Sequence, residues 1–105
     1  MTAVERFEAI LAGGDDNASL RFALGTEYAK LEDAARAIEH LRAAVALDPD
    51  YSAAWKLLGR VEAEAGLKEE AVSSYRQGIR AANQRGDVQA AREMRVFLKR
   101  LQGPV

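Results

Sequence analysis

The residues with the chemistry for catalysis or metal binding are few, and they form no recognisable set. His40 is the only histidine, it stands beside Glu39, and the chain contains no cysteine. A metal site normally needs several imidazole, thiolate or carboxylate ligands around one point, and nucleophilic catalysis needs a base beside an activated nucleophile. We therefore interpret His40 as a surface or half-buried structural residue.

Two other patterns are equally weak as reaction centres. Glu62 and Glu64 lie two positions apart on a predicted helix, so they point to different sides and form no acid–base pair. Gly13-Gly14 lacks the lysine and the length of a phosphate-binding loop, and such a pair is more typical of a helix end. The sequence predicts no enzyme activity, no bound metal and no cofactor.

Charge is unevenly distributed along the 105 residues, although the net charge is only −1. Residues 1–75 hold 8 basic and 14 acidic side chains, and residues 76–105 hold 7 basic and 2 acidic ones. Such a dipole favours an acidic partner or head-to-tail self-association, while an ordinary solvated surface is the alternative. The basic segment has only Phe97 as a nearby aromatic residue, so nucleic-acid binding is not indicated.

Nothing in the sequence indicates a membrane or an export signal. The first eleven residues contain Glu5, Arg6 and Glu8, whereas a signal peptide has a basic start followed by an apolar run. No apolar stretch approaches the roughly 18 residues of a membrane-spanning helix. We expect a cytoplasmic protein without membrane contacts.

Apolar residues recur at helical spacing in six segments, and glycine, proline or aspartate marks every break. A Thr2–Glu5 capping box opens the first, short helix, and Gly13-Gly14 ends it. The other predicted helices cover roughly residues 18–31, 34–47, 52–65, 68–82 and 88–101, followed by Gly103-Pro104. The short linkers predict antiparallel neighbours. The predicted apolar faces of the first and last helices are Val4, Phe7, Ile10, Leu11 and Val88, Ala91, Met94, Leu98, Leu101.

The middle of the chain repeats with a period of 34 residues. Leu24-Gly25 recurs as Leu58-Gly59. Five further pairs share this spacing: Ala29 and Ala63, Ala37 and Ala71, Ile38 and Val72, Leu41 and Tyr75, Val45 and Ile79. A fixed period of this length is the signature of stacked helical hairpins.

The motif within each unit resembles the tetratricopeptide repeat. The first unit reads Leu24-Gly25-x-x-Tyr28, then Ala37, Leu41, Ala44 and Pro49, and the second reads Trp55-x-x-Leu58-Gly59, then Ala71, Tyr75 and Gly78. The resemblance implies an all-α fold of antiparallel hairpins stacked as a short right-handed superhelix. It divides residues 1–105 into an N-terminal capping helix (1–14), two repeats (18–51 and 52–85) and a C-terminal capping helix (86–102). Small residues at Gly25 and Gly59 are expected to let each hairpin close against Ala37 and Ala71.

Three positions depart from the family pattern. Arg21 stands where the first unit would have tryptophan, and Glu62 stands where the second would have tyrosine. Asn83 replaces the proline that would stop the fifth helix, so this helix is expected to run longer.

The family resemblance also implies a function, which is binding of another protein without catalysis. First helices of such units line a concave groove, which here contains Phe22, Thr26, Lys30, Lys56 and Arg60. A basic stripe on the last helix extends it with Arg92, Arg95 and Lys99. This set suits a peptide with a carboxylate end or acidic side chains. Self-association as a homodimer, and an interaction domain excised from a larger assembly, are the alternatives. The identity of the partner is not encoded in one sequence.

Overall fold

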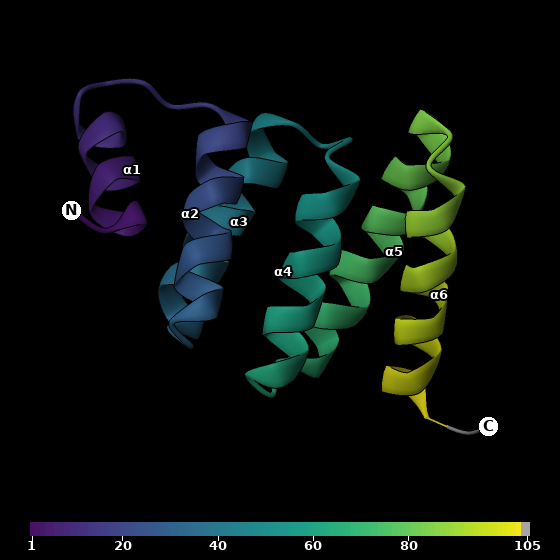
Figure 1. The fold of residues 1–105 in the computed structure, drawn as a ribbon. Helices are drawn as coiled ribbons and strands as arrows, with labels where there is room; N and C mark the ends of the chain where they lie inside the picture. The colour runs from purple at the N-terminus through teal and green to yellow at the C-terminus, as the bar shows by residue number, and fades with distance from the viewer. Residues whose placement is uncertain (104–105) are drawn as a thin grey trace.

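The computed structural model describes residues 1–103 and shows six helices, with no strand in that range (Figure 1). They are α1 (Ala3–Ala12), α2 (Ala18–Lys30), α3 (Ala34–Leu47), α4 (Ser52–Glu64), α5 (Lys68–Arg85) and α6 (Val88–Gln102). Consecutive helices run antiparallel and stand side by side in chain order (Figure 1). The predicted all-α fold of stacked hairpins is confirmed, while Pro104 lies outside the described residues.

Local capping groups set where most helices begin. The Thr2 hydroxyl accepts the Glu5 N–H at 3.1 Å, and the Glu5 carboxylate accepts the Thr2 N–H at 3.1 Å, as the capping box predicts. The hydrogen bond from the Thr2 N–H lowers the pKa of the Glu5 carboxyl. Side chains of three further residues accept backbone N–H groups at the starts of α2, α3 and α6: Asn17, Asp33 and Asp87.

Helix ends follow the backbone rules for proline and glycine. α3 ends before Asp48, which precedes Pro49 and has an extended backbone with ψ 91°. α5 has no such stop and continues to Arg85, three residues past the predicted end, because Asn83 replaces the expected proline. Gly86 then turns the chain in the left-handed region, with φ 73°.

The hairpins close where a glycine faces a large side chain. A Cβ atom on Gly25 would lie 2.5 Å from the Leu41 Cγ, and one on Gly59 would lie 2.6 Å from the Tyr75 ring. The sequence predicts alanines opposite both glycines, whereas the closest contacts are with the bulky residues four positions further along α3 and α5. A glycine is therefore needed because the facing helix inserts a large residue.

A glycine that faces large side chains also joins the second hairpin to the next helix. A Cβ on Gly78 of α5 would lie 2.5 Å from the Met94 sulfur of α6 and 2.7 Å from the Trp55 Cβ of α4. Met94 is fully buried, and the Tyr75 and Phe97 rings meet beside it at 5.8 Å between centroids. The buried residues form two clusters, one mainly in α2 to α4 and one in α5 and α6, and Gly78 lies between Trp55 of the first and Met94 of the second.

Each of the two end helices leaves one residue of its predicted apolar face exposed. Ile10 of α1 is 41% exposed and Val88 of α6 is 62% exposed, so neither belongs to the core. The 34-residue spacing places Ile10 at the position of Ala44 and Gly78, where a small residue allows the next helix to approach. No residue of α1 is buried, and the helix lies against α2 through half-buried Val4, Phe7 and Leu11.

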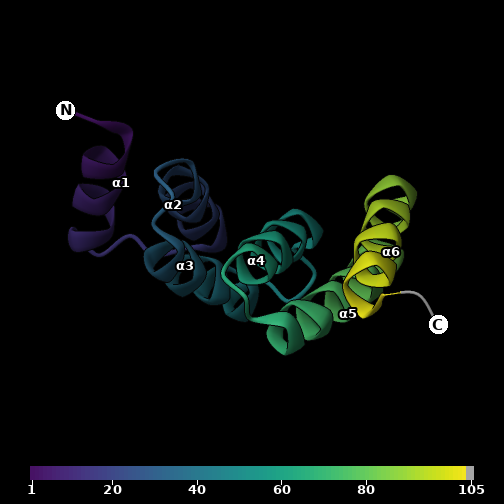
Figure 2. The ribbon, with the colours of Figure 1, turned by 90° about the horizontal axis from the view of Figure 1, so that it is seen from below.

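Seen from below, the stack forms an arc. α2, α4 and α6 lie on its inner side, while α3 and α5 lie on its outer side (Figure 2). The molecule is elongated, with principal extents of 48 × 28 × 18 Å. The predicted groove side, formed by the first helix of each hairpin, is therefore the inner side of the arc.

Replacing Gly59 with alanine tests the close approach. We expect Gly59→Ala to lower the free energy of unfolding by about 1–3 kcal/mol, because the added methyl overlaps the Tyr75 ring and the penalty exceeds alanine's better helix propensity. Urea unfolding followed by circular dichroism measures the change.

Gly13→Ala is the matched control, because Gly13 has φ −76° and a Cβ there would meet no atom closer than 3.4 Å. We expect it to be neutral or slightly stabilising. Equal effects of the two substitutions would contradict the packing described for Gly59.

Candidate functional site

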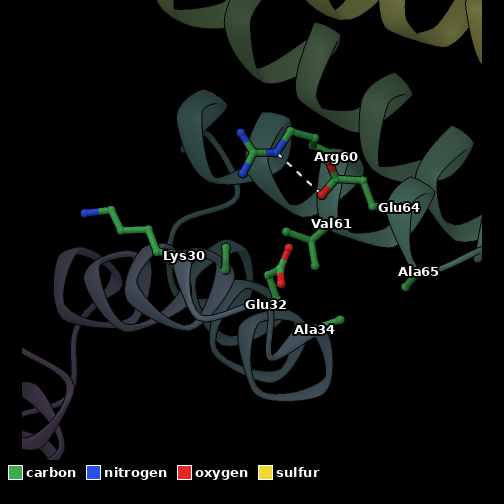
Figure 3. A pocket seen from close by; sticks show the side chains of 8 residues that line it. Lys30, Glu32, Ala34, Arg60, Val61, Glu64 and Ala65 are labelled. Carbon is green, nitrogen blue, oxygen red and sulfur yellow. Dashed lines mark ion pairs between the residues drawn. The ribbon is translucent and has the colours of Figure 1, made fainter.

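A pocket of about 460 Å³ opens between the first hairpin and α4 (Figure 3). We call it the inter-unit pocket, and it is lined by Ala29, Lys30, Glu32, Ala34, Arg60, Val61, Glu64 and Ala65. Two of the predicted groove residues, Lys30 and Arg60, therefore lie at one cavity. Its lining combines small apolar side chains with charges of both signs.

The charged groups of the inter-unit pocket are held only loosely by their neighbours. Arg60 Nε lies 3.9 Å from Glu64 Oε1, with both side chains more than half exposed. Lys30 Nζ lies 2.9 Å from Glu27 one turn earlier, so the ammonium extends away from Glu32 and Ala34 in Figure 3. Exposed pairs of this kind contribute about 0–1 kcal/mol, so a ligand can displace them at little cost.

Glu32 is a residue of this pocket that the sequence analysis missed. It adopts φ 58°, the left-handed region, and no other described non-glycine residue has a positive φ. The position 34 residues later is Gly66, with φ 83°. A side chain in this conformation costs about 1–2 kcal/mol, which glycine avoids. The available signal in the sequence was a glutamate at the position where the second unit has Gly66. Its carboxylate points toward the space below Arg60 (Figure 3).

Phe22 and Thr26 lie on α2 and are both half-buried. The Phe22 ring lies 5.0 Å from the Tyr51 ring, between centroids, and so packs against the chain leading into α4. The Thr26 hydroxyl donates to the Phe22 carbonyl oxygen at 2.8 Å. Neither residue lines the inter-unit pocket.

The other predicted cations divide into two groups. Lys56 Nζ pairs with Glu93 Oε1 at 3.1 Å, which links α4 to α6 and neutralises both charges. Because Glu93 turns toward α4, Arg95 lies about 200° further round the axis of α6. Arg92, Arg95 and Lys99 are exposed, and the structure does not bring them to the inter-unit pocket.

His40 is buried, at 5% exposure, whereas the sequence predicts a surface or half-buried position. Its ring stacks on Tyr28 with centroids 5.5 Å apart, which covers it. Arg21 Nη1 lies 3.0 Å from His40 Nδ1, and since arginine only donates, Nδ1 accepts and Nε2 carries the ring hydrogen. Glu8 Oε1 of α1 lies 3.3 Å from Nε2, without the geometry of a hydrogen bond.

Arg21 connects this histidine to the loop before α2. Its guanidinium donates twice to the Asp16 carboxylate, at 2.8 and 3.0 Å, which lowers the pKa of Asp16. Arg21 thus serves as a polar connector at the position where the family has tryptophan. Within residues 1–103 no three histidine, cysteine, aspartate or glutamate side chains are grouped so as to hold a metal ion.

Glu62 is a nearly fully buried carboxylate, at 2% exposure, in the middle of the stack. It accepts a hydrogen bond from the Ser74 hydroxyl of α5 and one from Arg42 Nη2 of α3, the latter at 3.1 Å. Glu62 therefore links three helices, at the position that Tyr28 occupies in the first unit. A second pocket, of about 510 Å³, opens over this network between α3 and α5.

The comparisons with known proteins match this architecture. The family model of the tetratricopeptide repeat matches residues 22–86. The chain belongs to the tetratricopeptide repeat family. A curated tetratricopeptide repeat-containing protein of Pseudomonas aeruginosa is 49% identical over 98 residues, covering 93% of each chain. Repeats of this family generally mediate protein–protein interactions and are generally non-catalytic.

Solved structures show the same fold. A solution structure of a protein from Bordetella parapertussis has 46% identity and a TM-score of 0.82, covering 97% of this chain and 89% of that one. A tetratricopeptide repeat domain protein from Salinibacter ruber has 27% identity and a TM-score of 0.78, covering 86% and 91%. YrrB, with 25% identity and a TM-score of 0.68, covers 94% of this chain and is matched over 58% of its own length. No helix within residues 1–103 is long and apolar enough to span a bilayer.

Arg42 tests the buried network. Arg42→Ala leaves the Glu62 carboxylate buried with only the Ser74 hydroxyl, so we expect a loss of about 3 kcal/mol in unfolding free energy. This is the lower end of the range for broken buried pairs, because the Arg42 side chain is itself 53% exposed and the adjacent pocket admits water. Urea unfolding measures it, and adding Glu62→Gln should recover part of the loss.

Arg76→Ala is the matched control, since Arg76 occupies the same position one repeat later and forms no ion pair with a described residue. An exposed change of this kind should stay within about 0.5 kcal/mol. A loss at Arg42 no larger than at Arg76 would show that Glu62 does not depend on its arginine.

Proposed function

We propose that this protein is a non-catalytic adaptor that binds a peptide segment of another protein at the inter-unit pocket. The observation that carries the proposal is Glu32, which is kept in a left-handed conformation at the edge of a pocket between two hairpins. Residues with strained backbone conformations cluster at ligand-binding sites, and here the Glu32 side chain lines the pocket.

The lining of the pocket fits a peptide better than a small apolar ligand. Arg60 and Lys30 offer donors for a carboxylate, as in an acidic or carboxylate-ended segment, and Glu32 accepts a backbone N–H or a basic side chain. Ala29 and Val61 supply an apolar floor. Phe22 extends the apolar contact along α2, on the inner side of the arc.

One further observation supports this assignment. YrrB, a structural neighbour of the same fold, is described as a tetratricopeptide repeat protein with an unusual peptide-binding site. The absence of cysteine also fits a reducing compartment, and the proposal takes the protein to be cytoplasmic. Because the charged groups are exposed, binding is modest in strength and weakens with salt.

The test begins with a partner recovered by affinity purification and identified by mass spectrometry. Synthetic peptides that tile this partner are then titrated calorimetrically. We expect Lys30→Glu combined with Arg60→Glu to weaken binding of the active peptide by at least about tenfold, because the charge of both basic side chains that line the pocket is reversed.

The double variant Arg76→Glu and Arg80→Glu changes the net charge equally on exposed positions of α5. We expect it to retain affinity within about twofold. Wild-type affinity in the Lys30/Arg60 variant would exclude the inter-unit pocket as the binding site.

A further inference from the structure

Unpaired cations gather at the C-terminal end of the stack. From Arg21 to Arg60 every basic residue pairs with a carboxylate within 4.0 Å. In residues 61–103, Arg85 forms an ion pair with Asp48, but the structure records none for Lys68, Arg76, Arg80, Arg92, Arg95, Lys99 or Arg100. Like charges without neutralising partners repel one another, so binding of a negatively charged partner would relieve electrostatic repulsion at this end.

Three of these cations share one face of α6. Met94 packs on α5 and Glu93 turns toward α4, which fixes the orientation of the helix. Helical spacing then places Val88, Arg92 and Lys99 on the side away from Met94, with Arg95 beside them. We call this set, together with Val96, the α6 outer stripe. It is about 16 Å long from Val88 to Lys99, at 1.5 Å per residue.

The α6 outer stripe combines two valines with three basic side chains. Val88 is 62% exposed and Val96 is 43% exposed, among the most exposed large apolar side chains of the described residues. In the preceding hairpins, α2 is covered by α3 and α4 by α5 (Figure 1). No described residue covers α6 on the corresponding side, and the figure shows α6 at the edge of the stack.

We propose that the α6 outer stripe docks an acidic amphipathic helix of a partner protein, which continues the stack as its next helix. The combination of valines and cations on one face decides between partner classes. A helix with glutamates beside an apolar row satisfies both the cations and the valines. Nucleic acid would satisfy the cations but gain nothing from the valines, and this face presents no aromatic side chain for base stacking. The surface is distinct from the inter-unit pocket.

The test uses the full chain and a synthetic probe. The probe is a peptide of about 18 residues that forms an amphipathic helix, with a row of leucines flanked by glutamates. A peptide in which lysine replaces every glutamate is its counterpart. Nuclear magnetic resonance of the ¹⁵N-labelled protein reports where each binds. We expect the acidic peptide to shift amides of residues 88–102 and the lysine peptide to leave them unchanged.

Charge reversal at the stripe then measures its contribution. We expect Arg92→Glu combined with Arg95→Glu to weaken the acidic peptide at least about tenfold, since each exposed pair contributes little alone but two reversals turn attraction into repulsion. Arg6→Glu combined with Lys68→Glu is the control, because both residues are exposed and form no ion pair with a described residue. It should weaken binding less than about twofold. Val96→Ser, which keeps every charge, should weaken it measurably.

Four results would overturn the proposal. Shifts confined to α2 and α4 would place the peptide in the inter-unit pocket instead. Equal losses in the two charge-reversed variants would show binding to net charge alone. Tighter binding of a short DNA duplex than of the acidic peptide, unaffected by Val96→Ser, would assign the face to nucleic acid. Self-association of the wild-type chain through this face, detected by sedimentation velocity, would assign the face to a second copy of the chain.

Discussion

The architecture depends on the close approach of helices at three glycines, Gly25, Gly59 and Gly78. Each lies where a large side chain of the neighbouring helix enters the space that a Cβ atom would occupy. Because protein interiors are packed as densely as organic crystals, a missing methyl at one helix determines how close the next one sits. The separation of the two helices within each hairpin, and of α5 from α6, follows from these contacts.

The sequence predicts the repeated features of the molecule well. Apolar and small residues recur every 34 positions, so the helices and their order follow from periodicity, while the family follows from the resemblance of the repeated motif. The helix boundaries agree wherever a cap or proline sets them, as at Thr2 and Pro49. The predicted apolar faces are wrong at Ile10 and Val88. Periodicity indicates which side of a helix is apolar, but not whether a neighbouring helix covers it.

The side-chain contacts found beside the candidate site are less predictable, because each of them occurs only once in the chain. Glu62 meets Arg42 and Ser74, which lie 20 and 12 residues away, and His40 meets Arg21 at a separation of 19. No periodic pattern encodes such pairs. The prediction that placed Lys56 in the groove also failed to anticipate its ion pair with Glu93, whose direction depends on how α6 is rotated against α5. Side-chain types on one helix are therefore readable from sequence, whereas their partners on another helix are not.

The weak attachment of α1 has a consequence for the order in which the molecule opens. In a linear stack each helix is stabilised mainly by its neighbours, so the free energy of local unfolding differs from one end to the other. α1 contributes no buried residue and has a single charged contact with α3, between Glu8 and His40. It is the natural first unit of sub-global opening, and its departure uncovers Tyr28 and His40 while the hairpins behind it stay folded. Fluctuations of the native state thus begin at the N-terminal end and leave the inter-unit pocket assembled.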